Sequence, residues 1–299
     1  MGENMKRRYL QIILAAVLFL LALGLTLYPV ISNYYNQRHQ SQIQTAYRKV
    51  LEQTDTAELK RIREQAAAYN AAITPGAAGK AYTQESITVA SEDYVNQLNV
   101  GGSGIMGYIE IPKIHVDLPI YHGTGSDSLD RGTGHLLGSS LPVGGESTHT
   151  IITGHSGMAS QKMFTDLEQL QEGDVFYLRV LDETLAYEVK AVHTVLPHDT
   201  TYLGIVPGQD LCTLVTCTPT GINTHRLLVQ GSRIPYEPTI EDQNAESEYE
   251  VAASSHWEDQ YWLGIRLGLA AMVCIVLLLN VLLYLRKQKP KKGGRYVRK

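Results

Sequence analysis

The residues best able to carry covalent chemistry lie at the ends of short apolar runs in this 299-residue chain. Cys217 ends the run TLVTC and is followed by Thr218 and Pro219; proline cannot continue a central strand. A strand end is a place where a scaffold presents reactive groups to a cleft, and a thiolate is a nucleophile. An isolated cysteine is more often a buried structural residue. Cys217 is therefore a candidate nucleophile, with a structural cysteine as the alternative.

An arginine near this cysteine has the chemistry of an oxyanion stabiliser. Arg226 follows Cys217 by nine residues, and Gly221 and Asn223 between them indicate a turn. A short turn brings the next antiparallel strand back beside the first, so Arg226 is expected to approach Cys217. Its charge would then stabilise the oxyanion formed when the thiolate attacks a carbonyl. A surface or ion-paired arginine is the alternative.

A histidine at another strand end is a candidate for proton transfer. His155 ends the run THTIITGH and lies between Gly154 and Gly157. Its imidazole titrates near neutral pH, so it can protonate a leaving amine and take a proton from an incoming one. Spacing alone does not select it, and seven other histidines compete on chemistry: His115, His122, His135, His149, His193, His198 and His225.

The elements that must position these residues are short strands between residues 106 and 235. Each of six runs has the length and composition of a strand, and LDET fits a hairpin turn: GYIEIPKIHVDLPIY, THTIITGH, DVFYLRV, LAYEVKAVHTVL, LCTLVTC and HRLLVQGSRI. Many short strands with few helices predict a barrel or a sandwich. A closed barrel is favoured because closure removes exposed edges.

Residues 106 to 234 resemble the catalytic domain of sortases, most closely the class C sortases that polymerise pilins. The matching text is MGYIEIPKIHVDLPIYHGT, GTGHLLGSSLPVGGESTHTIITGHSG, FTDL and TLVTCTPTGINTHRLLVQG. TLVTC fits the T-L-x-T-C signature, Arg226 has the family spacing, and ITGH supplies His155. The resemblance implies a mainly β fold: a closed sortase-type barrel of about eight strands with N-terminal helices and two flanking transmembrane helices. It assigns catalysis to Cys217, His155 and Arg226.

The resemblance also implies the reaction. Cys217 would cleave an LPxTG-like sorting signal of a pilin or surface protein between Thr and Gly, and a pilin Lys amine would resolve the thioacyl enzyme. No cofactor or metal is expected, because the thioester conserves the bond energy. The alternatives are a housekeeping sortase that anchors proteins to peptidoglycan, a membrane-tethered cysteine protease, and a non-catalytic tethered binding module.

Both ends of the chain carry long uncharged runs. Residues 9–31 and 267–285 contain no charged side chain, and each is long enough to cross a hydrocarbon core of about 30 Å as a helix. Basic residues precede the first run and follow the second, which predicts both termini in the cytoplasm and the catalytic domain on the extracellular face of the cell membrane. A cleaved signal peptide is the alternative for the first run, although no A-x-A-like site follows it.

The net charge of -4 averages a basic tail and an acidic middle. Residues 32–260 hold about 14 Lys and Arg against about 29 Asp and Glu, roughly -15 in sum. This balance argues against a nucleic-acid partner. The basic tail suits the anionic surface of a lipid bilayer. Of the three cysteines, Cys274 lies in the second run, and Cys212 and Cys217 are five apart on one strand, so they face opposite ways and are not expected to bridge.

These observations divide the chain into seven segments: 1–8 cytoplasmic N-terminus, 9–31 transmembrane anchor, 32–105 helical and lid-like segment, 106–236 catalytic barrel, 237–262 linker, 263–285 transmembrane helix and 286–299 basic cytoplasmic tail. Helical spacing covers residues 41–72, with a restart after Asp55, and a short helix is expected around residues 91–98.

Class C sortases usually have a lid with an Asp-Pro-aromatic motif before the barrel. Residues 73–94 occupy that place without such a motif. Tyr82 and Tyr94 are candidates to plug the cleft instead, with ordinary packing as the alternative.

Overall fold

Helices precede the barrel, and side-chain caps mark where two of them begin. The computed structural model describes residues 2–73, 78, 91–158, 161–236 and 266. Helix α1 (Gly2–Gln53) is followed by α2 (Thr56–Ala71), where Asp55 accepts a hydrogen bond from the Ala57 N–H at 3.0 Å. The short helix α4 (Glu92–Asn96) begins after Ser91, whose hydroxyl accepts from the Tyr94 N–H. Aspartate and serine are favoured N-caps. The restart after Asp55 and the short helix are thus confirmed.

The predicted membrane spans are not confirmed by the structure. Within the described part of the chain, no helix has both the length and the apolar character needed to cross a membrane. Residues 9–31 lie within α1, and residues 263–285 lie almost wholly outside the described residues, as do the linker and the basic tail. Contacts divide the chain into two units, residues 1–252 and 253–299, and the fold described below is that of the first.

Eight strands form a closed barrel, which confirms the barrel part of the predicted fold. In chain order they are β1 (Ile105–Ile111), β2 (Val116–His122), β3 (Thr133–His135), β4 (Thr148–Thr153), β5 (Val175–Val180), β6 (Glu183–Val195), β7 (Asp210–Thr218) and β8 (His225–Ile234). The short helices η1 (Val100–Gly102), η2 (Pro112–Ile114), α5 (Ser126–Leu129) and η3 (Leu167–Gln169) connect them. The spatial order is β1-β2-β3-β4-β7-β8-β6-β5, and β5 pairs with β1 to close the barrel.

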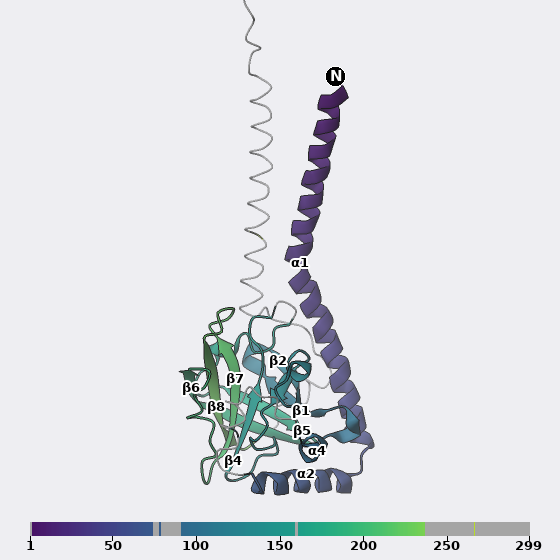
Figure 1. Ribbon diagram of the computed structural model, residues 1–299. Helices are drawn as coiled ribbons and strands as arrows, with labels where there is room; N and C mark the ends of the chain where they lie inside the picture. The colour runs from purple at the N-terminus through teal and green to yellow at the C-terminus, as the bar shows by residue number, and fades with distance from the viewer. Residues whose placement is uncertain (1, 74–77, 79–90, 159–160, 237–265, 267–299) are drawn as a thin grey trace, which may run out of the picture. The chain divides into compact units, whose positions relative to one another are not determined.

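The barrel departs from the sequence-based strands in two places. The first apolar run is two antiparallel strands, β1 and β2, because η2 with Pro112 interrupts it. Strand β3 has only three residues, too few for a period-two pattern, and sequence pattern did not identify it. Strands β2/β3 and β4/β7 are parallel, and the other pairs are antiparallel. The parallel β4/β7 pair places β4 beside β7, which pairs with β8 on its other side (Figure 1).

Two layers of apolar side chains pack against the central strands. The interior cluster contains inward residues such as Ile109, Phe176, Leu178, Leu214 and Val229. An outer cluster covers the other face of β4, β7 and β8, and it consists of Ala78, Leu136, Ile151, Val195, Leu203, Val215 and Leu228. Residues one apart on a strand face opposite ways. Strand β7 is therefore apolar on both faces, which explains why LCTLVTC reads as a continuous apolar run rather than an alternating one.

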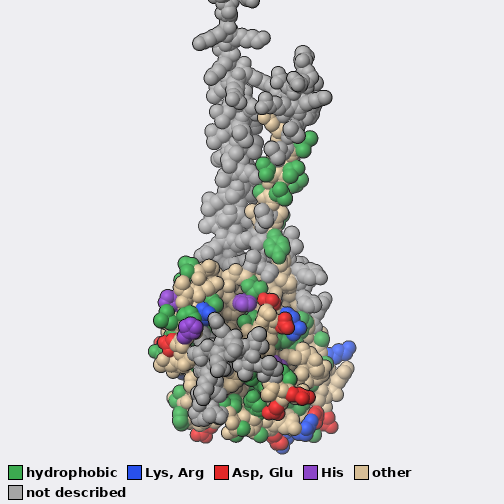
Figure 2. Space-filling model, viewed as in Figure 1, with side chains coloured by type: hydrophobic (Ala, Val, Ile, Leu, Met, Phe, Trp, Pro, Cys, Tyr) green, Lys and Arg blue, Asp and Glu red, His purple; other side chains and the backbone are tan. Residues whose placement is uncertain are grey.

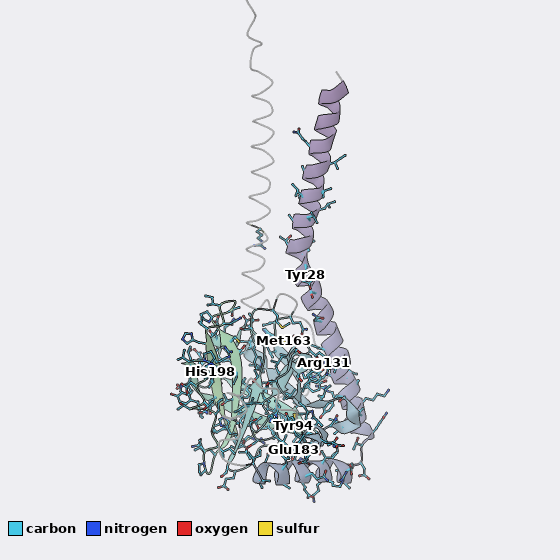
Figure 3. All side chains as sticks on the ribbon, viewed as in Figure 1. Tyr28, Tyr94, Arg131, Met163, Glu183 and His198 are labelled. Carbon is cyan, nitrogen blue, oxygen red and sulfur yellow. The ribbon has the colours of Figure 1, made fainter. Side chains whose placement is uncertain are left out.

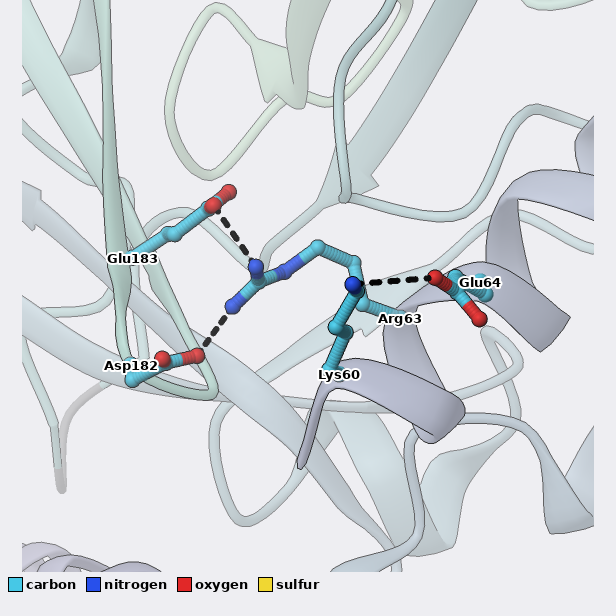
Figure 4. Close-up of polar contacts among 5 residues, drawn as sticks. All are labelled: Lys60, Arg63, Glu64, Asp182 and Glu183. Atoms are coloured by element: carbon cyan, nitrogen blue, oxygen red, sulfur yellow. Dashed lines mark hydrogen bonds and ion pairs between the residues drawn. The ribbon is translucent and has the colours of Figure 1, made fainter. Parts of the chain in front are cut away.

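Helix α2 is attached to the barrel by polar contacts at two points. The Asn70 side-chain amide donates to Leu141 O at 3.1 Å, and its carbonyl oxygen accepts from Leu141 N at 2.7 Å. Arg63 pairs with Asp182 and, at 2.8 Å, with Glu183, at the β5–β6 turn (Figure 4). Asn70 is buried, whereas the charged side chains are partly exposed. The amide pair is therefore the stronger attachment.

The structure answers only part of the lid prediction. Tyr94 has no exposed surface and lies among the packed side chains of the barrel region (Figure 3). Its hydroxyl is 2.9 Å from His135 Nδ1 and accepts from the Gly123 N–H at 2.9 Å. A plugging role for Tyr94 is therefore wrong, because the ring is a core residue that binds β3. Tyr82 and most of residues 73–94 lie outside the described residues.

Candidate active site

The hairpin of β7 and β8 brings Cys217 and Arg226 together. They are direct partners in the antiparallel ladder, next to the turn between the strands. Directly opposed residues have Cα atoms about 4.5–5.5 Å apart and side chains on the same face. Val195 of β6 pairs with Arg226 from its other side. The expected approach of Arg226 to Cys217 is confirmed at the level of strand register.

Strand alternation determines which face these residues occupy. Val215 and Leu228 both belong to the outer cluster. Cys217 and Arg226 are each two residues from one of them along the same strand, so they share the outer face rather than the barrel interior. The thiol is half-buried at the edge of the outer cluster. Cys217 therefore lies next to apolar side chains on one side and is partly exposed to solvent on the other.

His155 reaches the same region from β4. Strand β4 pairs with β7 up to Thr153 opposite Val215, and the Gly154 N–H donates to Val215 O at 3.0 Å. His155 is the next residue, so it lies beside the end of β7 that carries Cys217. Its side chain is 39% exposed, and Nε2 is 3.8 Å from the carboxylate of Asp130. The structure thus brings the three predicted residues to one end of three adjacent strands.

The Arg226 guanidinium is bound to the turn next to it. Its Nη1 donates to Asn223 O at 3.2 Å and to His225 O at 3.1 Å. A guanidinium has five N–H donors, so these two bonds use only part of its capacity. Arg226 therefore has donors for a substrate oxygen as well as for the turn.

Burial excludes two of the competing histidines as candidates for proton transfer. His135 is fully buried, and this burial lowers its pKa to about 4. His149 is also buried, which lowers its pKa, and its ring nitrogens contact Gly204 O and Thr213 Oγ1, both at 2.7 Å. Both imidazoles are neutral at pH 7 and bound on both nitrogens. They hold the fold together and do not face a cleft.

The second cysteine contrasts with Cys217. Cys212 is fully buried in the interior cluster, and burial, together with the nearby Asp210 charge, raises the pKa of its thiol well above the ordinary value. A buried protonated thiol is inert. Both described cysteines are free, and they face opposite sides of β7 as predicted.

Three residues near the site were not singled out from the sequence. Asp130 faces His155, Ser156 donates to Cys217 O at 2.6 Å, and Thr216 donates to Gly154 O at 2.7 Å. The available signals were weak: Ser156 and Thr216 stand directly beside predicted catalytic residues, and Asp130 lies in a separate loop. Among the described residues, no group of three or more His, Cys, Asp or Glu side chains is arranged to hold a metal ion.

Comparison with known proteins agrees with this geometry. Residues 109–234 match the model of the sortase domain family. The solved structure of sortase C from Streptococcus pneumoniae is 43% identical, covers 67% of this chain and all of its own, and aligns with a TM-score of 0.60. Sortase C-1 from Actinomyces oris is 45% identical, with 60% of this chain and 99% of its own covered and a TM-score of 0.56.

A curated relative matches more distantly. Sortase A of Streptococcus agalactiae is 28% identical over 155 residues, which are 51% of this chain and 60% of the relative. This chain therefore spans about three fifths of that relative's length. The resemblance drawn from the motifs is confirmed, because a solved sortase C is covered over its full length at 43% identity. The chain belongs to the sortase family, a family of cysteine transpeptidases.

Proposed function

We propose that this protein is a membrane-anchored pilin sortase, with Cys217 as nucleophile, His155 as proton-transfer residue and Arg226 as oxyanion-stabilising cation. The observation that carries the proposal is the direct pairing of Cys217 with Arg226, with His155 two residues beyond the end of the neighbouring strand β4. A nucleophile, a titratable base and a fixed cation at one strand end are the parts that acyl transfer requires.

In the proposed reaction, the Cys217 thiolate attacks the Thr carbonyl carbon of an LPxTG-like sorting signal. Arg226 donates to the resulting oxyanion. The Thr–Gly bond breaks, His155 gives a proton to the departing Gly amine, and a thioester with Cys217 remains. A pilin Lys amine then attacks the thioester and gives its proton to His155, which forms the isopeptide bond and regenerates the thiolate.

The choice of a pilin substrate rests on the structural neighbours. The S. pneumoniae sortase C structure is described in terms of pilin substrate specificity, and a group B Streptococcus sortase C, 40% identical, is described as pilus-related. Acidic and basic side chains are interspersed on the face shown in Figure 2 and form no basic stripe there, which argues against a nucleic-acid partner on that face.

We also propose that residues 9–31 and 263–285 anchor the protein in the cell membrane, with the barrel on the extracellular face. The support is the uncharged character of residues 9–31 and 267–285 and their basic flanks. The described side chains of α1 add to it, since Ile13, Leu18, Leu20 and Leu21 are exposed apolar residues. Residues exposed on a water-soluble surface are rarely so uniformly apolar.

The test uses the full chain in detergent with a peptide that contains an LPxTG-like signal. Intact mass measurement is expected to show an acyl adduct that Cys217→Ala abolishes. Cys212→Ala is the matched control and is expected to keep the adduct, because Cys212 is buried on the other face of β7. An adduct on the Cys217→Ala variant would contradict the assignment.

The acceptor is tested in the same preparation. A pilin with an accessible Lys is expected to resolve the adduct faster than water or an oligoglycine amine. Faster resolution by oligoglycine than by the pilin would indicate a wall-anchoring sortase. A resolution rate that neither amine raises above the rate in water would indicate a protease. Absence of any adduct with a reactive Cys217 thiol would exclude the LPxTG-like signal as substrate.

A further inference from the structure

The chain leaves the barrel ladder between the end of strand β4 and His155. In a regular parallel ladder, main-chain donors from every second residue bond to the neighbouring strand. The Gly154 N–H donates to Val215 O, so the next donor in register would be the Ser156 N–H, and its acceptor would be Cys217 O. Strand β4 ends at Thr153 instead. The Ser156 hydroxyl donates to Cys217 O at 2.6 Å and so takes the place of that ladder bond.

A turn explains why a side chain makes this bond. Gly157 has a φ of +73°, in the region that favours glycine, and a Cβ at this position would lie 2.8 Å from Thr220 Cγ2. The chain therefore turns sharply directly after Ser156. This turn removes the main chain from the ladder and leaves the serine side chain to reach Cys217.

A second hydroxyl bonds on the other side of the histidine. Thr216, which is buried, donates to Gly154 O at 2.7 Å. The residues directly before and after His155 are thus each hydrogen-bonded to the end of β7, at Thr216 and Cys217. His155 itself is partly exposed between these two attachments. The relative position of the imidazole and the thiol is consequently set by hydrogen bonds next to both of them.

We propose that Ser156 is a positioning residue for the transfer reaction: its hydroxyl holds the Cys217 main chain against the His155 segment. The proposal rests on the function proposed above for Cys217 and His155. Loss of the hydroxyl allows the two segments to separate by a fraction of an ångström or more, and a misplacement of about 1 Å can reduce a rate about 100-fold.

The test compares Ser156→Ala and Ser156→Thr in the full chain in detergent. Ser156→Ala is expected to lower kcat about 10- to 100-fold with KM changed less than about 3-fold, because the loss falls on reacting geometry. Ser156→Thr retains a hydroxyl and is expected to stay within about 3-fold of the parent. Ser128→Ala is the matched control and is expected to keep the parent's kcat: its hydroxyl, on α5, makes a similar partly buried bond to His122 O at 2.7 Å.

A substrate-free readout separates this proposal from the proposed function. The rate at which iodoacetamide alkylates Cys217 is measured against pH in the parent, Ser156→Ala and His155→Ala. Ser156→Ala is expected to shift the profile toward that of His155→Ala, with an unchanged urea midpoint. If the parent turns over no sorting peptide but this shift appears, the proposed substrate fails and the positioning role stands.

Two outcomes would overturn the role of Ser156. The first is a Ser156→Ala variant with the parent's kcat and alkylation profile. The second is a loss of activity that follows a lowered urea midpoint and that Ser156→Thr does not restore, which would mean that the serine serves only the stability of the turn.

Discussion

His135 makes the stability of the barrel depend on pH. Its ring is fully buried on β3. Nε2 is 2.9 Å from Ser140 O, and a carbonyl only accepts, so Nε2 carries the hydrogen. Nδ1 then accepts from the Tyr94 hydroxyl at 2.9 Å. The hydrogen bonds of the folded protein therefore stabilise the neutral form of His135. A second proton would place a charge in an apolar interior.

The sign and size follow from the lowered pKa. Burial is the main cause that lowers the His135 pKa from 6.5 to about 4 in the folded protein. Between these values the unfolded chain binds more protons than the folded one, so stability rises with pH. The contribution is fully present above pH 6.5 and is lost as pH falls toward 4. The difference of about 2.5 between the unfolded and the folded pKa corresponds to about 3 kcal/mol in the free energy of unfolding.

The perturbation is His135→Gln, which keeps an amide donor but does not titrate. Urea unfolding of the full chain in detergent is measured at pH 7 and pH 4. The variant is expected to be less stable than the parent at pH 7, by about 1–2 kcal/mol for the altered hydrogen bonds. Acid should then destabilise it by about 3 kcal/mol less than the parent.

The exposed histidine His198 provides the control, since His198→Gln is expected to keep the parent's pH dependence. Carboxylates and His149 titrate in every variant and cancel in the comparison. An equal loss of stability between pH 7 and pH 4 in His135→Gln and in the parent would refute the argument from burial.

Three further predictions concern single contacts. Asn70→Ala is expected to lower the free energy of unfolding by about 2 kcal/mol, because it leaves the buried Leu141 N–H without its bond, and an unchanged urea midpoint would contradict this. Arg63→Ala is expected to lower it by less than about 1 kcal/mol, with a smaller effect in high salt, because the pair is partly exposed; an effect of several kcal/mol would show that this reasoning is wrong. A polar alkylating reagent is expected to modify Cys217 and not Cys212 in the folded chain, and mass mapping that finds modified Cys212 would disprove its burial.

Much of the fold could be predicted because each long strand has its own local signal. The apolar runs, their turn residues, the helix restart after Asp55 and the short helix near residues 91–98 correspond to elements of the structure. Strand β3 was missed because three residues carry no period. The plugging role considered for Tyr94 was wrong because nothing local distinguishes a tyrosine that packs against β3 from one that faces a cleft.

Local sequence alone was enough to name the candidate residues, to give their order and to indicate the family that they resemble. Motif letters and turn residues are local, so TLVTC, ITGH and Arg226 were recognisable without a structure. It also provides the basis on which membrane anchoring is proposed, since apolar length and flanking charge need no tertiary contact.

The pairing of the strands was needed to see that His155 lies near Cys217 in space and that His135 and His149 are buried. Strands β4 and β7 are parallel neighbours although about 60 residues separate them in the chain, and such a pairing is not encoded in either strand alone. The same pairing brings Ser156 to Cys217 O. The sequence contains the reactive groups, but the closed ladder determines which of them meet, because register and face are properties of strand pairs.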